Sequence, residues 1–135
     1  MIILKTLEEL HLMRESAQLV SKTLGMIAKE IKPGVTTLYL DKLAHDFIKD
    51  HGGYPAFLGM YGFPNSLCIS PNEEVVHGIP NDKPLKEGDV LSVDCGVYMN
   101  DFYGDHAYSF EVGEVAPETK KLLKITKESL YKGIE

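Results

Sequence analysis

The residues that most suggest chemistry are two aspartates, Asp94 and Asp105, which lie within segments that otherwise read as buried strands. Aspartate is uncommon in strands, and an unpaired carboxylate in an apolar setting costs free energy. Asn100-Asp101 is a plausible two-residue hairpin turn between the segments, because both residues tolerate a positive φ. In that register Asp94 faces Ala107 and Gly96 faces Asp105, which puts both carboxylates on one face, whereas a three-residue turn would separate them. We therefore predict a hard-cation site shared by the two aspartates, with room for the ion at the small residues Gly96 and Ala107.

A histidine followed by glycine, His77-Gly78, is the next candidate. The glycine lets a backbone segment or a ligand approach closely. A histidine beside apolar residues is often structural, so the spacing alone leaves a structural and a functional role equally open. Two carboxylates and one imidazole leave a divalent ion under-coordinated, and such a site needs water or further protein ligands.

Length and composition indicate one soluble globular domain formed by residues 1–135. The apolar fraction is 44%, the charged fraction is 25%, and both are ordinary for such a domain. The net charge is −6 and no basic stretch is interleaved with aromatic residues, so we expect no nucleic-acid partner. We see no signal peptide and no apolar run of membrane-spanning length, and we expect no membrane association. Two cysteines, Cys68 and Cys95, make no disulfide framework, which favours a reducing cytosol and a cytoplasmic location.

Helices are predicted at both ends of the chain, with strands between them. Thr6 and Glu9 form a capping box for a first helix that Lys32-Pro33-Gly34 ends. Thr36 or Thr37 caps a second helix, and Pro117 begins a third. Residues 66–70 alternate as a strand does, and residues 90–110 form the aspartate hairpin. This order predicts an α+β fold, an antiparallel sheet with helices packed on one face.

Apolar residues at helical spacing predict which side of each helix faces the core. In the first helix they are Leu7, Leu10, Met13, Ala17, Val20, Leu24, Ile27 and Ile31. In the second they are Leu40, Leu43, Ala44, Phe47 and Ile48, and in the third Leu122, Leu123, Thr126 and Leu130 are expected to face inward.

Several short strings, in this order, closely resemble type I methionine aminopeptidases. They are Cys68-Ile69-Ser70-Pro71-Asn72-Glu73, Val76-His77-Gly78-Ile79-Pro80, Gly88-Asp89-Val90, Val93-Asp94 and Tyr103-Gly104-Asp105. The capping box and the segments 32–36 and 126–130 also resemble that family, so the resemblance extends over essentially the whole chain. It implies the pita-bread fold, two pseudo-symmetric α+β halves around a dinuclear metal centre, with this chain as the N-terminal half.

The resemblance also implies roles for individual residues. Asp94 would chelate one metal, Asp105 would bridge two, and His77 would be the catalytic residue that hydrogen-bonds the substrate. The remaining ligands of the family, one histidine and two glutamates, belong to the second half. The implied cofactors are two divalent ions, which could be Co, Mn, Fe, Zn or Ni. His106 departs from the family, since many members carry a small hydroxyl residue there.

The implied activity is removal of the N-terminal methionine from newly made proteins, with the N-terminal peptides of nascent chains as substrates. Phe57, Met60 and Phe63 match the pocket-lining stretch of the family, and Cys68 is expected nearby. Aromatic and sulfur side chains suit a thioether, but they also fill ordinary cores, and both readings stay open.

Three other hypotheses remain at this point. The chain could be a non-catalytic protein-binding module of the same fold, although two carboxylates facing each other in a sheet give a scaffold no physical advantage. It could belong to an aminopeptidase that cleaves X-Pro bonds. It could also pair with the missing C-terminal half or with a second copy of itself.

Overall fold

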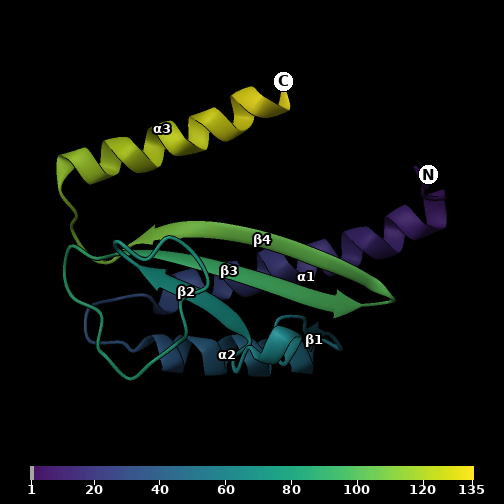
Figure 1. The fold of residues 1–135 in the computed structure, drawn as a ribbon, viewed down its shortest axis with the longest axis horizontal. Helices are drawn as coiled ribbons and strands as arrows, with labels where there is room; N and C mark the ends of the chain where they lie inside the picture. Colours follow the sequence, from purple (N-terminus) through teal and green to yellow (C-terminus); the bar gives the residue numbers. More distant parts are fainter. Residues whose placement is uncertain (1) are drawn as a thin grey trace.

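The computed structural model describes residues 2–135 and contains a four-stranded antiparallel sheet with three helices (Figure 1). The elements in chain order are α1 (Leu7–Glu30), α2 (Thr37–Asp50), β1 (Tyr54–Pro55), the short 3₁₀ helix η1 (Met60–Gly62), β2 (Leu67–Pro71), β3 (Val90–Met99), β4 (Phe102–Glu111) and α3 (Pro117–Ile134). β3 is the central strand. β4 pairs with its whole length on one edge, while β2 and β1 pair with successive parts of its other edge.

The first two predicted helices have the expected N-caps. The Thr6 side chain accepts a hydrogen bond from the Glu9 N–H, and the Glu9 carboxylate accepts one from the Thr6 N–H, which completes the capping box of α1. Thr36, rather than Thr37, caps α2 by accepting from the Tyr39 N–H.

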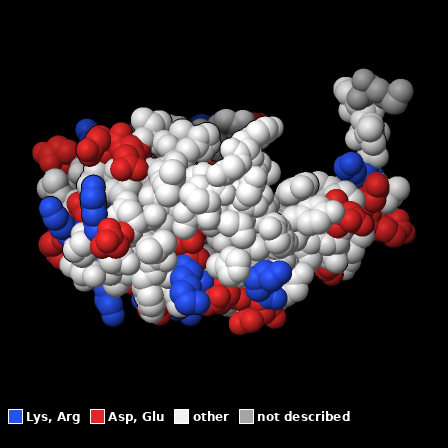
Figure 2. Space-filling model, turned by 60° about the horizontal axis from the view of Figure 1, so that its bottom comes forward, with Lys and Arg blue, Asp and Glu red and all other residues white. Residues whose placement is uncertain are grey.

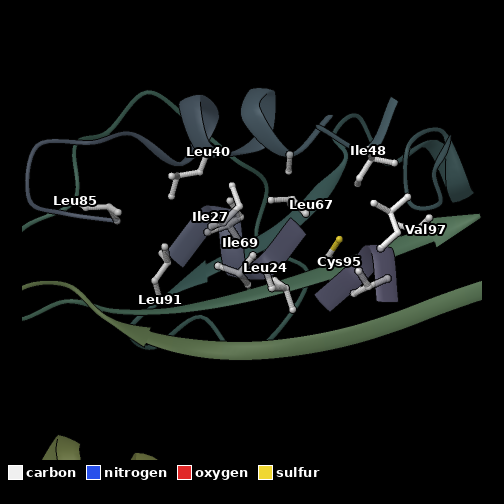
Figure 3. Packing of buried hydrophobic residues seen from close by; sticks show 14 of the residues in the cluster. Leu24, Ile27, Leu40, Ile48, Leu67, Ile69, Leu85, Leu91, Cys95 and Val97 are labelled. Atoms are coloured by element: carbon white, nitrogen blue, oxygen red, sulfur yellow. The ribbon is translucent and has the colours of Figure 1, made fainter. Parts of the chain in front are cut away.

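The core lies between the sheet and the helices α1 and α2. Alternate residues of β3, namely Leu91, Val93, Cys95 and Val97, are fully buried on this face, as a strand half covered by helices requires. Figure 3 shows Leu40 and Ile48 of α2 directed into the same cluster, together with Leu24 and Ile27 of α1. The α+β prediction, with helices packed on one face, is confirmed for these two helices.

The predicted apolar stripe of α1 is wrong in its first turns. Leu7 is 83% exposed and Leu10 is 47% exposed, because the start of α1 projects beyond the end of the sheet (Figure 1). Two polar residues, Ser16 and Thr23, are buried instead. The Ser16 hydroxyl donates to the Met99 carbonyl at 2.8 Å and the Thr23 hydroxyl to the Leu19 carbonyl at 2.8 Å, so neither group is left unsatisfied.

Helix α3 runs on the other side of the sheet from α1 and α2 (Figure 1). None of its residues is buried, and the expected inward direction is wrong for Leu122, which is 65% exposed. Leu130 is 61% exposed but does line a hollow between α3 and the sheet. A helix side chain becomes buried only where another element packs on it, and α3 stands off the sheet. No helix of residues 2–135 is both long and apolar enough to span a membrane.

On the face drawn in Figure 2, the lysine and arginine side chains lie singly among aspartate and glutamate rather than in a cluster.

Candidate functional site

The aspartate hairpin has the predicted register. Asn100 and Asp101 form its turn with φ angles of 55° and 64°, as a type I′ turn requires. Asp94 pairs with Ala107 and Gly96 with Asp105, so both carboxylates lie on the face that α1 and α2 leave uncovered. On the other edge of β3, Cys68 pairs with Asp94 and joins the same face.

A hollow of about 640 Å³ lies between this face, the segment 75–77 and α3. Cys68, His77, Asp94 and Ala107 are among its lining residues. Phe57, Met60, Phe63 and Asp105 are not, although Asp105 lies beside Asp94. The hollow thus gathers three of the predicted site residues, from β2, from the following loop and from β3.

The two carboxylates disturb each other. The pKa of Asp94 is raised to about 6, first by burial and then by the charge and hydrogen bonding of the adjacent Asp105, while His77 and the Cys95 N–H act in the opposite direction. One oxygen of Asp94, Oδ1, is buried without a hydrogen-bond partner among residues 2–135. A buried, unsatisfied anionic oxygen next to a second carboxylate is an arrangement that a hard cation would stabilise.

The pair does not form a closed metal site by itself. Within residues 2–135, no group of three or more His, Cys, Asp or Glu side chains converges with the geometry for a metal ion. The residues present therefore fit part of a coordination shell, with oxygen ligands of the kind that divalent ions accept.

Phe57 occupies the space above Gly96, where the sequence had suggested room for an ion. A Cβ atom added to Gly96 would lie 2.5 Å from Cε1 of the Phe57 ring. The expectation about Gly96 is therefore wrong, because the glycine accommodates an aromatic ring. Ala107 does line the hollow, and the open space lies on that side of Asp94.

The other predicted pocket residues differ in how far they are buried. Met60 begins η1 and is 43% exposed, and Phe63 directly follows η1 and is half-buried. Cys68 is buried, and burial together with Asp94 and Asp105 raises its thiol pKa to about 11, so the thiol is neutral near pH 7 and suits an apolar wall. Roles for these residues in substrate binding stay predictions.

His77 is held by the glycine that follows it. Gly78 donates its N–H to the Ser70 hydroxyl at 3.0 Å and accepts a hydrogen bond from the Ile69 N–H at 2.9 Å. A Cβ atom at Gly78 would collide with the Ile69 carbonyl oxygen, so the predicted close backbone approach is confirmed. His77 itself has a φ of 60° and is exposed at the hollow.

Sequence reasoning missed one buried charged residue, Asp41 of α2, which is only 7% exposed. Its carboxylate accepts three hydrogen bonds from residues 65–67, directly before Cys68. The available signal was the spacing of three polar residues, Thr37, Asp41 and His45, at every fourth position of the helix.

We expect Asp94→Asn to stabilise the metal-free chain near neutral pH. The pKa of Asp94 in the folded chain is about 6, above its ordinary value of 3.8, so the folded chain binds the Asp94 proton more tightly than the unfolded chain. This proton stabilises the fold fully below pH 3.8, and the stabilisation is lost as pH rises through 6. The substitution should raise the free energy of unfolding by about 1 kcal/mol at about pH 7, a value reduced for solvent screening because the Asp94 side chain is only partly buried. Urea unfolding with a chelator measures it.

The matched control for this prediction is Asp82→Asn, which removes an exposed carboxylate from a loop. Asp82→Asn should leave the free energy of unfolding unchanged both at about pH 4 and at about pH 7. A gain for Asp94→Asn that is as large at about pH 4 as at about pH 7 would contradict the carboxylate repulsion inferred here.

Comparisons with known proteins show the family of the chain. The model of metallopeptidase family M24 matches residues 11–135. The chain is 49% identical to methionine aminopeptidase from Clostridium perfringens and 48% identical to methionine aminopeptidase 1 from Bacillus subtilis, covering 100% of itself and 54% of each relative. The chain spans about half the length of these curated relatives.

Solved structures give the same result for the fold. The methionine aminopeptidase from Rickettsia prowazekii superposes with a TM-score of 0.98 at 44% identity, covering 100% of this chain and 54% of that one. The enzyme from Thermotoga maritima gives 0.94 at 39% identity, covering 98% and 53%. An Xaa-Pro dipeptidase from Bacillus anthracis gives 0.79 at only 22% identity, covering 96% and 35%, which shows a shared fold alone.

These matches confirm the fold expected from the sequence, one half of the pita-bread arrangement. Membership of a metallopeptidase family also implies the use of divalent metal ions. Since the family model covers nearly the whole chain, the chain belongs to metallopeptidase family M24.

Proposed function

We propose that this chain supplies one half of the active site of a methionine aminopeptidase, an enzyme that removes the N-terminal methionine from newly made proteins. The observation that carries the proposal is the buried, unpartnered Asp94 oxygen beside Asp105. The names of the relatives from Clostridium perfringens and Bacillus subtilis support it.

In this proposal Asp94 and Asp105 would hold the divalent ions, Asp94 one of them and Asp105 both, with further ligands from outside this chain. When bound, such ions supply a water of lowered pKa and a docking point for the α-amine of a substrate. A non-catalytic module of the same fold would retain the repulsion between Asp94 and Asp105 without any cation to relieve it.

In this proposal His77 contacts the substrate. Its imidazole reaches the hollow from a loop that two hydrogen bonds at Gly78 fix to β2. We propose that it donates a hydrogen bond to the oxygen of the scissile amide, where negative charge develops during hydrolysis. Cys68 and Phe57 would form part of the apolar wall for the methionine side chain. Because both cysteines are unpaired thiols, we propose a reducing, cytoplasmic setting.

The test is a chimera in which this chain is followed by the remaining part of the Clostridium perfringens relative. The chimera should release methionine from Met-initiated peptides, and His77→Ala should lower kcat about 100-fold without changing the metal content. A folded, metal-loaded chimera that leaves such peptides intact would refute the proposed activity. Equal loss of metal in His77→Ala and Asp105→Asn would contradict the separate roles.

A further inference from the structure

We infer that a polar stripe on α2, formed by Thr37, Asp41 and His45, is a positioning device for the two segments that carry the site residues. The three residues lie one helical turn apart and therefore on one side of α2. Their neighbours Leu40, Ala44 and Ile48 are buried in the core. The stripe thus runs beside the apolar face, where α2 meets the loops around the sheet.

Asp41 fixes the segment before β2. Its Oδ1 accepts hydrogen bonds from the Ser66 N–H at 2.9 Å and the Leu67 N–H at 2.8 Å, and its Oδ2 accepts one from the Asn65 side-chain amide at 2.8 Å. These donors lie between Phe63 and Cys68, the last two residues of the proposed methionine pocket. A nearly buried carboxylate with two backbone donors on one oxygen holds the chain in a single geometry.

The other two residues of the stripe act on the same loops. His45 Nδ1 and the Ser66 hydroxyl share a hydrogen bond of 2.8 Å. Thr37 accepts from the Asn81 N–H at 2.8 Å and donates to the Asn81 carbonyl at 3.2 Å, and the Leu38 N–H also donates to that carbonyl at 3.0 Å. Asn81 closes the segment that begins at His77. One helix therefore anchors both the pocket segment and the histidine loop, and the link to substrate recognition rests on the proposed function.

The two cysteines provide a test within one molecule. Cys68 lies one residue beyond the segment held by Asp41, whereas Cys95 is fully buried in the central strand and reports general unfolding. Alkylation by iodoacetamide, followed by peptide mass analysis, measures both rates. In Asp41→Ala, Cys68 should react about tenfold faster than in Asp41→Asn, the change expected when backbone donors lose their acceptor. Cys95 should keep its rate within about twofold.

The comparison of alanine with asparagine separates geometry from charge. Asp41 also raises the pKa of the Cys68 thiol, and both variants remove that charge, but only asparagine keeps an oxygen for the Ser66 and Leu67 amides. Asp46→Asn, which changes an exposed carboxylate of the same helix, is the matched control and should leave both rates unchanged. Equal rates for the alanine and asparagine variants, or parallel acceleration of Cys95, would overturn the inference.

Substitutions of Thr37 test the inference independently of the cysteines. Thr37→Val should raise hydrogen exchange of the Asn81 amide about tenfold and leave the Ser66 and Leu67 amides unchanged, while Thr37→Ser should retain protection. Uniform exchange in all three amides would contradict separate anchoring of the two loops.

These readouts need no catalysis, so an inactive chimera would refute the proposed function and leave the positioning result standing. In an active chimera, Asp41→Ala should raise KM for Met-peptides about tenfold with kcat little changed, and a loss confined to kcat would contradict the role in the pocket.

Discussion

Replacement of Asp105 by asparagine is expected to abolish Mn²⁺ binding by this chain. The wild-type chain should bind Mn²⁺ or Co²⁺ weakly, because two carboxylates are only part of a coordination shell. Asparagine removes the charge that makes the Asp94 site attractive to a cation and also relieves the repulsion that raises the pKa of Asp94. The affinity for Mn²⁺ should fall about 100-fold or more. Loss of a residue that only hydrogen-bonds a metal ligand can already cost that much, and Asp105 is proposed to be a ligand itself. Calorimetric titration measures it.

The matched control for this titration is His77→Ala, which keeps both carboxylates. Its affinity for Mn²⁺ should equal that of the wild-type chain. Tight binding of two ions by the isolated wild-type chain would show that residues 2–135 contain more ligands than the carboxylate pair.

Gly104→Ala is expected to cause a large loss of stability for so small a change in side chain. A Cβ atom at this position would lie 2.7 Å from backbone atoms of Ser16 and Ala17 in α1. A helix backbone cannot turn aside as a flexible side chain can, so α1 must move away from β4. The free energy of unfolding should fall by about 3 kcal/mol, at the upper end of overpacking effects. Urea unfolding followed by circular dichroism measures it.

Gly25→Ala is the matched control, since it makes the same chemical change in α1. A Cβ atom at Gly25 would meet no atom within 4 Å. This variant should gain about 0.5–1 kcal/mol, because alanine has the higher helix propensity. Similar effects of the two substitutions would contradict the close packing of α1 on β4.

The hairpin could be predicted from sequence because every determinant of its register is local. Asn100 and Asp101 accept the positive φ of a two-residue turn, and the alternation along β3 then fixes which residues share a face. The helix caps at Thr6 and Thr36 are local in the same way. The convergence of Asp94 and Asp105 follows from these features alone.

Contacts between distant segments could not be predicted in this way. Asp41 looks in sequence like any polar residue on a helix, and its partners are backbone donors more than twenty residues away. The Phe57 ring covers Gly96 because the loop after β1 folds back. Neither hydrophobic periodicity nor a turn motif in the sequence predicts this contact. The apolar pattern of α1 likewise predicts which side of the helix faces the core. It does not predict at which residue the helix passes beyond the end of the sheet.

In the proposed site, Asp94 and Asp105 converge because a cation neutralises them. Paramagnetic broadening of amide resonances during a Mn²⁺ titration tests it most directly, since the effect locates the ion without requiring catalysis. Residues 94–96 and 105–107 should broaden first and together, and Asp105→Asn should remove the effect. Broadening that begins at other acidic side chains, such as Glu73 and Glu74 or Glu111 and Glu114, while the hairpin stays sharp, would contradict the claim.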